Sequence, residues 1–194
     1  VYMEAIQNTN ILLDMCDSYA LDTSKKYPKI YKDSVATFKQ KINEGFEHNK
    51  YVKQHPKKEV IKRIREEEQV YEKVEAVDFM LLMRYLKEWQ LKNGIYTGPG
   101  RGSVSGSEIA YVLGITEMDS IKFDLNFFRF LNPSRVTNSD IDLDFGDKDR
   151  EKMKKFLLDD HMGLPNIQTA EIITFNTIKM KGAIKDIGLS LINI

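Results

Sequence analysis

A strict alternation of acidic and large apolar residues near position 140 constrains this sequence more than any other feature. The acids are Asp140, Asp142 and Asp144, and the intervening residues are Ile141, Leu143 and Phe145. A period of two is typical of an extended strand, so the apolar side chains should pack inward while the carboxylates line up outside. Like charges along one face repel one another unless a cation neutralises them. Carboxylate oxygens suit Mg²⁺ or Mn²⁺, and the segment is therefore a candidate metal site.

Two other interpretations of this acidic segment stay open. The three aspartates occupy positions 1, 3 and 5 of a calcium-binding loop, and Glu151 falls at position 12, but Phe145 stands at position 6, where the sharp turn needs glycine. The segment is also compatible with a solvated edge strand whose charges oppose aggregation.

A glycine-rich segment, Gly98–Ser107, is the second candidate for binding chemistry. Its four glycines allow the main chain to approach an anion closely, and Arg101 and three serines add hydrogen-bond donors. It follows a predicted short strand at 95–97 and precedes a helix that Ser107 can cap and Gly114 can end. The amino end of that helix is expected to face the same anion. No named phosphate motif matches, so a flexible loop without a ligand remains an alternative.

The part of the chain before the glycine-rich segment is expected to be helical. Helical spacing recurs over residues 1 to about 70, and Val74–Trp89 predicts a helix with one buried face that Asn93–Gly94 ends. Trp89 is interpreted as a core residue of that helix. The pattern before residue 93 therefore predicts packed helices more than it predicts a binding or catalytic site.

Charge is uneven along the chain although it balances overall, with 29 basic and 29 acidic residues. Seven basic residues lie between Lys50 and Arg65, where Glu59 is the single acid. Such a run is typical of a solvated helix face, and contact with phosphates is the alternative.

The single Cys16 excludes an intramolecular disulfide and agrees with a reducing cytoplasm. No apolar run approaches the ~18 residues needed to span a membrane, so we expect a cytoplasmic protein with no membrane partner. Because the chain starts at Val1 and ends at Ile194 without a polar tail, we expect it to be a segment of a longer protein.

Nucleotidyl transfer needs at least a segment that binds phosphate and a group of carboxylates that binds metal. A glycine turn followed by a carboxylate strand would provide both. In such chemistry two metals ~4 Å apart activate the attacking hydroxyl and stabilise the leaving pyrophosphate. Arg129 lies among aromatic residues at 127–131, shortly before the acids. It could pair with a carboxylate or contact a phosphate, and the sequence does not choose.

Four motifs, in this order and spacing, resemble the C-family polymerases, the bacterial polymerase III alpha subunit. They occupy residues 98–103, 110–116, 129–136 and 140–145. The sequence also resembles the entry into the family's thumb at 172–175, Lys181, Lys185, Asp186 and Gly188. The resemblance covers roughly residues 60–190. The sequence departs from the family at Ser139, where proline is usual, at Phe128, where an acid is usual, and at Leu189, where arginine is usual.

The resemblance implies an α+β fold, the palm of the polymerase beta-like nucleotidyltransferase type, with a mixed sheet flanked by helices. It divides the chain into a helical lead-in over 1–55, a palm core over 56–171 and the start of a thumb over 172–194.

The resemblance also implies the residues of the site. Mg²⁺ is expected on Asp140 and Asp142 in a two-metal centre, and Asp144 matches a further catalytic acid. The third carboxylate ligand is expected outside this chain, so the isolated segment should not polymerise. The residues expected to bind the triphosphate are Gly100, Arg101, Gly102, Ser103 and Arg129.

The function implied by the resemblance is that of a DNA-directed DNA polymerase, which adds dNTPs to a primer 3′-hydroxyl during DNA replication. Its expected partners are primer–template DNA, dNTPs and, for the full-length parent, a sliding clamp and other replisome subunits. Two alternatives remain: a non-catalytic nucleotide- or DNA-binding segment, and a nucleotidyltransferase with a non-DNA substrate.

Overall fold

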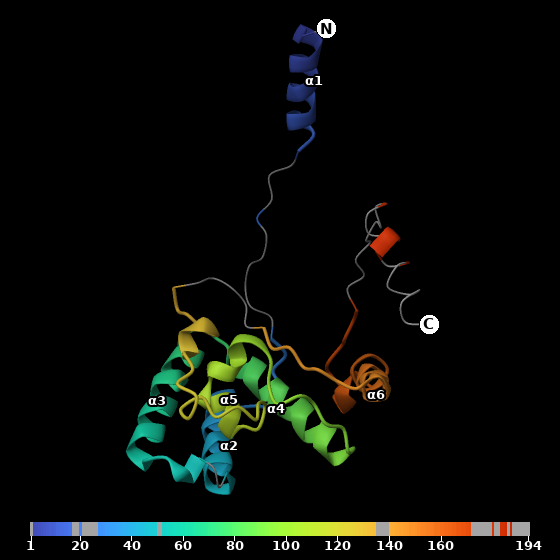
Figure 1. The fold of residues 1–194 in the computed structure, drawn as a ribbon. Helices are drawn as coiled ribbons and strands as arrows, with labels where there is room; N and C mark the ends of the chain where they lie inside the picture. Colours follow the sequence, from blue (N-terminus) through green and yellow to red (C-terminus); the bar gives the residue numbers. More distant parts are fainter. Residues whose placement is uncertain are drawn as a thin grey trace.

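The structure is a computed structural model that describes residues 2–16, 20, 27–49, 52–134, 140–171, 180, 183–185 and 187. Helices make up most of the regular structure in these residues (Figure 1). The α-helices are α1 (Tyr2–Asp14), α2 (Ser34–His48), α3 (Lys57–Lys73), α4 (Val77–Lys92), α5 (Glu108–Val112) and α6 (Asp147–Leu158). The 3-10 helices are η1 (Val52–Gln54), η2 (Gly102–Gly106), η3 (Phe127–Arg129) and η4 (His161–Gly163).

The core lies where α2, α3, α4 and α5 meet. Helix α2 packs against α4 and α5, and α3 packs against α5. A Cβ added at Gly45 of α2 would lie 2.2 Å from the Val112 carbonyl oxygen, so the two backbones meet at a point where no side chain fits. The fully buried side chains there include Phe38, Tyr71, Met80, Leu81 and Ile109. Helix α1, in contrast, buries none of its residues and lies apart from this core in Figure 1.

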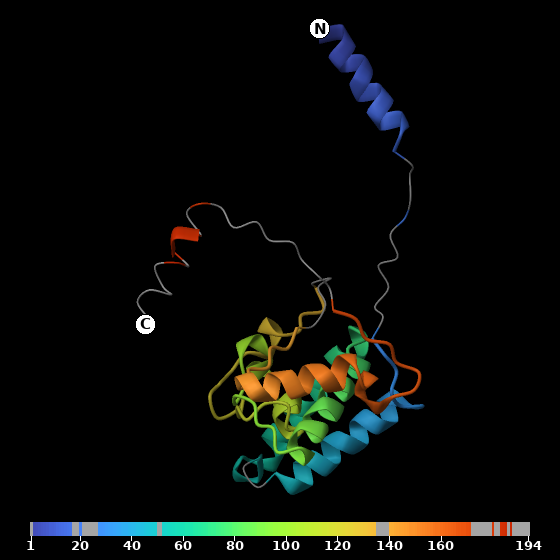
Figure 2. The same ribbon diagram turned by 90° about the vertical axis from the view of Figure 1, so that its right-hand side faces the viewer.

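The end of α4 agrees with the sequence. Asn93 caps the helix, and Gly94 follows with φ +66°, a backbone conformation that favours glycine. Trp89 stacks on Phe156 of α6 with ring centroids 3.8 Å apart, which holds α6 against α4 (Figure 2). The interpretation of Trp89 as a packing residue is therefore confirmed.

The predicted α+β fold with a mixed sheet is wrong. Across the described ranges the structure contains no sheet, and the β pairing there is a single antiparallel bridge between Thr97 and Phe145. The physical reason lies in the residues after Thr97. Pro99 lacks the N–H that a ladder needs, and Gly100 and Gly102 adopt positive φ angles that turn the chain away from its neighbour.

The predicted thumb segment at 172–194 lies almost entirely outside the described residues, as do Lys181, Asp186 and Gly188. Ser139 and Leu189, two of the departures from the family pattern, also lie outside them. The division into lead-in, palm core and thumb therefore stays a prediction. None of the helices that the structure describes combines the length and hydropathy needed to cross a bilayer.

Candidate functional site

The acidic segment at 140–145 is extended, and its two faces differ as the alternation predicts. Asp140, Asp142 and Asp144 are exposed. The apolar residues between and after them are half-buried against the core, namely Ile141, Leu143 and Phe145. This burial holds the backbone to the core and directs the three carboxylates outward, even though no sheet forms.

The glycine-rich segment runs directly beside these acids. The Gly98 N–H donates to the Asp144 carbonyl oxygen over 3.2 Å. A Cβ added at Gly98 would lie 3.7 Å from the Asp144 Cβ, and one added at Gly102 would lie 3.9 Å from Asp142 Oδ2. The structure thus brings together two segments that lie far apart in the sequence.

Arg101 connects the two segments by charge. Its Nη1 lies 2.9 Å from Asp144 Oδ1, and its Nε lies 3.9 Å from Asp142 Oδ2. The hydrogen bond to Asp144 and the charges of both aspartates raise the pKa of Arg101 above its ordinary value. All three side chains are more than half exposed, and ion pairs of this kind contribute little stability. Arg101 can therefore exchange its carboxylate partners for a phosphate at small cost.

Of the other predicted triphosphate residues, Gly100, Gly102 and Ser103 flank Arg101 in the sequence, and Arg129 belongs to η3. Gly100 and Gly102 have φ angles of +147° and +73°, and Ser103 is exposed. Arg129 ends η3, which packs against η2. Arg129 forms no ion pair with a carboxylate among the described residues, and both of its predicted roles, pairing with a carboxylate and contact with a phosphate, stay predictions.

Among the described residues, these acids would need donors from a substrate or from elsewhere to hold a cation. The described residues contain no group of three or more His, Cys, Asp or Glu side chains that could hold a metal alone. Mg²⁺ commonly takes one or two carboxylates and completes its shell with water and substrate phosphates. Asp140 and Asp142, exposed on one face of the extended segment, offer such a donor pair. The calcium-loop alternative does not fit, because positions 8 to 12 of that loop already belong to α6.

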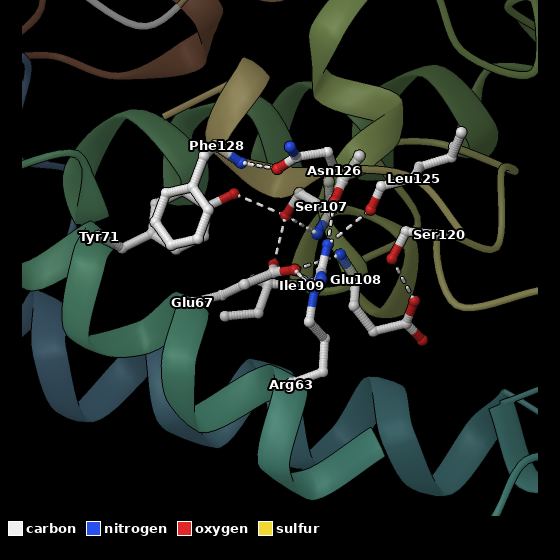
Figure 3. Close-up of polar contacts among 12 residues, drawn as sticks. Arg63, Glu67, Tyr71, Ser107, Glu108, Ile109, Ser120, Leu125, Asn126 and Phe128 are labelled. Atoms are coloured by element: carbon white, nitrogen blue, oxygen red, sulfur yellow. Dashed lines mark hydrogen bonds and ion pairs between the residues drawn. The ribbon is translucent and has the colours of Figure 1, made fainter. Parts of the chain in front are cut away.

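A buried polar cluster, here called the Glu67 cluster, fixes the far end of the glycine-rich segment (Figure 3). The fully buried Glu67 carboxylate accepts hydrogen bonds from the backbone N–H groups of Glu108 and Ile109 at 2.9 and 3.0 Å. The Ser107 hydroxyl donates to it over 2.7 Å, and Arg63 Nε donates over 2.7 Å. The amino end of α5 therefore already binds an anion, the side chain of Glu67. The expectation that this end faces a ligand is wrong.

Hydrogen-bond directions in the Glu67 cluster can be assigned by counting protons. Ser107 Oγ accepts from the Ala110 N–H and gives its one proton to Glu67, so the Tyr71 hydroxyl must donate to Ser107. Burial raises the pKa of Glu67, and its four hydrogen bonds oppose this effect. Because all four partners donate, they stabilise the ionised carboxylate. Burial also raises the pKa of Tyr71 well above its ordinary value.

The same cluster anchors η2 and the turn before η3. Arg63 Nη2 donates to the carbonyl oxygens of Gly106 and Leu125 at 2.8 and 2.9 Å. One basic residue of the predicted basic run therefore points inward and has a structural role. Four others line an open groove on the outer side of α3 beside Ile61, namely Lys57, Lys58, Lys62 and Arg65. This groove is a solvated face, as the charge pattern indicates.

Lys87 of α4 was not identified from the sequence as a site residue. Its side chain is 4% exposed, and Nζ donates to the Thr97 hydroxyl at the start of the glycine-rich segment. Burial lowers the pKa of Lys87, and the charge of Glu117 opposes this. A signal was present, because Met80, Met83, Lys87 and Gln90 follow helical spacing and share the buried face of α4.

Known proteins resemble this chain over most of its length. The family described as bacterial DNA polymerase III alpha NTPase domain matches residues 36–192. DNA polymerase III subunit alpha of Halalkalibacterium halodurans is 36% identical over 193 residues, which cover 98% of this chain and 17% of that protein. The subunit of Chlamydia muridarum is 34% identical over 215 residues, which cover 97% of this chain and 17% of that protein. The subunit of Helicobacter pylori is 34% identical over 208 residues, which cover 95% of this chain and 17% of that protein. The chain thus spans a small part of each relative's length.

Proposed function

Because the chain belongs to the bacterial DNA polymerase III alpha NTPase domain family, we propose that residues 98–145 bind the incoming nucleotide in a DNA-directed DNA polymerase. The full-length parent would add dNTPs to a primer 3′-hydroxyl, and this chain would supply the part of its palm that binds triphosphate and metal. The observation that carries the proposal is the approach of Gly102 and Arg101 to Asp142 and Asp144. A phosphate-binding loop beside a row of carboxylates suits a substrate that carries both phosphate and Mg²⁺.

Each residue has a distinct role in this proposal. The glycine-rich segment offers backbone N–H groups and Ser103 to the triphosphate, and Arg101 turns from the aspartates to the phosphates when nucleotide binds. Arg129 contacts phosphate from η3. Asp140 and Asp142 would hold Mg²⁺, with a further carboxylate from outside this chain.

Bound Mg²⁺ would neutralise the triphosphate and favour ionisation of the primer hydroxyl. Asp144 pairs with Arg101 as long as no nucleotide is bound. Primer–template DNA, dNTPs and the other replisome subunits are the partners of the parent under this proposal.

Substitution of the acids in the full-length subunit tests the proposal. Asp142→Asn keeps the shape of the side chain and removes its charge, and we expect template-directed dNTP incorporation to fall more than roughly a hundredfold. Asp147→Asn, an exposed acid in the first turn of α6, is the matched control and should leave incorporation unchanged. Full incorporation by folded Asp142→Asn would remove the metal-site assignment.

The same assay separates the two alternative functions. A segment that only binds nucleotide or DNA would leave incorporation intact in Asp140→Asn and Asp142→Asn. A nucleotidyltransferase with a non-DNA substrate would transfer nucleotide without a template, and its activity would not follow the template sequence. Abolished, template-dependent incorporation in folded variants excludes both.

A further inference from the structure

Lys87 is a buried cation with an unusual set of partners. Its one described hydrogen bond goes to a neutral acceptor, the Thr97 hydroxyl. Among the residues that the structure describes, no carboxylate forms an ion pair with it, although Glu117 acts on it electrostatically. An ammonium group removed from water without a close counter-charge destabilises a fold. Packing alone does not explain why a charged residue occupies this position.

The location of Lys87 connects it to both parts of the proposed nucleotide site. Thr97, its partner, forms the bridge with Phe145 and immediately precedes Gly98, whose N–H binds the Asp144 backbone. The Glu117 N–H donates to the carbonyl oxygen of Pro99, two residues further along. Lys87 is therefore buried beside Thr97, where the chain enters the glycine-rich segment and meets the acidic segment, whereas Arg101 is exposed.

The neighbours of Lys87 show what the fold alone would accept there. Met80 and Met83 lie on the same buried face of α4, and methionine is similar to lysine in length and flexibility. A methionine at position 87 would remove the uncompensated charge while filling similar space, and such replacements are often neutral or stabilising. The charge of Lys87 is thus more easily explained by binding than by stability.

We propose that Lys87 is a positioning residue for the triphosphate: its ammonium group holds Thr97 and places a buried positive charge beneath the glycine-rich segment. The ligand class is the polyphosphate of a nucleotide, which this charge attracts. The inference rests on the proposed function, since it assumes that this segment receives the triphosphate.

The experiment uses the full-length subunit and radiolabelled dATP as the probe. We expect Lys87→Met to raise the Kd and the KM for dATP roughly tenfold, with kcat at saturation and affinity for primer–template DNA within about twofold of the parent. The melting temperature should stay the same or rise, because a buried charge is lost. Lys92→Met, the same change at an exposed position of α4, is the control and should alter none of these quantities.

A second substitution separates positioning from packing. Thr97→Val removes the acceptor hydroxyl and keeps the size of the side chain, so it should raise the Kd for dATP in the same direction. If Lys87 acts through Thr97, the double variant binds dATP no more weakly than the weaker single variant. Should Lys87→Met fail to fold, the Kd of Thr97→Val decides alone.

An unchanged Kd for dATP in folded Lys87→Met, or a melting temperature that falls in parallel with affinity, would overturn the inference. So would additive effects in the double variant. These outcomes differ from a failure of the proposed function. That failure would appear as full dNTP incorporation by Asp142→Asn, regardless of the result with Lys87→Met.

Discussion

At the scale of single residues, Glu108 shows how burial changes the behaviour of an ordinary carboxyl group. It is fully buried at the amino end of α5, and burial raises its pKa to about 7, an effect that Asp119 and Glu67 increase. Ser120 donates a hydrogen bond to Oε2, and His55 opposes the shift. Near neutral pH, therefore, a proton on this one carboxyl group affects the stability of the fold.

The direction of the pH effect follows from the sign of the shift. The pKa of Glu108 is raised in the folded state, so the stability it contributes is complete below pH about 4.5 and is lost as pH rises through about 7. We expect the melting temperature to fall between pH 5 and 8, and Glu108→Gln to flatten this dependence. Thermal unfolding across that range measures both, with Glu59→Gln at an exposed position of α3 as the control. An equally steep decline in Glu108→Gln would assign the effect to other groups.

At the scale of elements, α3 organises the far end of the glycine-rich segment. Arg63 and Glu67 reach from α3 to η2, to the turn before η3 and to the amino end of α5. Helix α5 is a five-residue element, too short to be stable alone, so its position depends on these contacts. The position of the far end of the glycine-rich segment therefore depends on α3.

Removal of the charge on Glu67 tests this dependence. Glu67→Gln places an amide N–H₂ against backbone donors and leaves Arg63 without its counter-charge, so the free energy of unfolding should drop by about 3 kcal/mol. Urea denaturation measures this decrease in the free energy of unfolding. The control is Glu66→Gln, an exposed neighbour whose ion pair with Lys62 spans 3.9 Å and which should change stability by less than about 0.5 kcal/mol. Equal effects of the two substitutions would contradict the assigned role.

The elements also show what the sequence can and cannot predict. Spacing and capping identified the end of α4 and the Ser107 cap of α5, because both depend on local geometry. Burial on alternate residues was predicted at 140–145 for the same reason. Sheet formation was not predictable in this way, because it requires partner strands, and the chain beyond Thr97 turns away after one bridge.

The buried charges were missed for a related reason. Glu67 and Lys87 each lie on the apolar face of a helix, at helical spacing from residues such as Ile64 and Met83. A charged residue within such a stripe is the signal that could have identified both. The backbone groups that donate to Glu67 lie 41 and 42 residues away, and the partner of Lys87 lies ten residues away beyond the end of its helix, so these contacts follow from the tertiary structure.

At the scale of the whole molecule, the candidate site depends on contacts between distant segments. The glycine-rich segment meets the acidic segment through Arg101, joins the core through Lys87 and Thr97, and is anchored to α3 by the Glu67 cluster. The family relation supports a DNA polymerase parent, and the matched region covers 17% of the Halalkalibacterium halodurans relative. Under the proposed function, a carboxylate from elsewhere in the parent completes the metal site.

The central claim is that the glycine-rich and acidic segments form one site for metal and nucleotide. Electron paramagnetic resonance of Mn²⁺ with the full-length subunit, titrated in the presence and absence of dATP, tests it most directly. We predict that dATP tightens Mn²⁺ binding, and that Asp142→Asn and Gly102→Val each abolish this coupling while Asp147→Asn preserves it. Mn²⁺ binding that is independent of dATP, or coupling that survives both substitutions in folded protein, would contradict the claim.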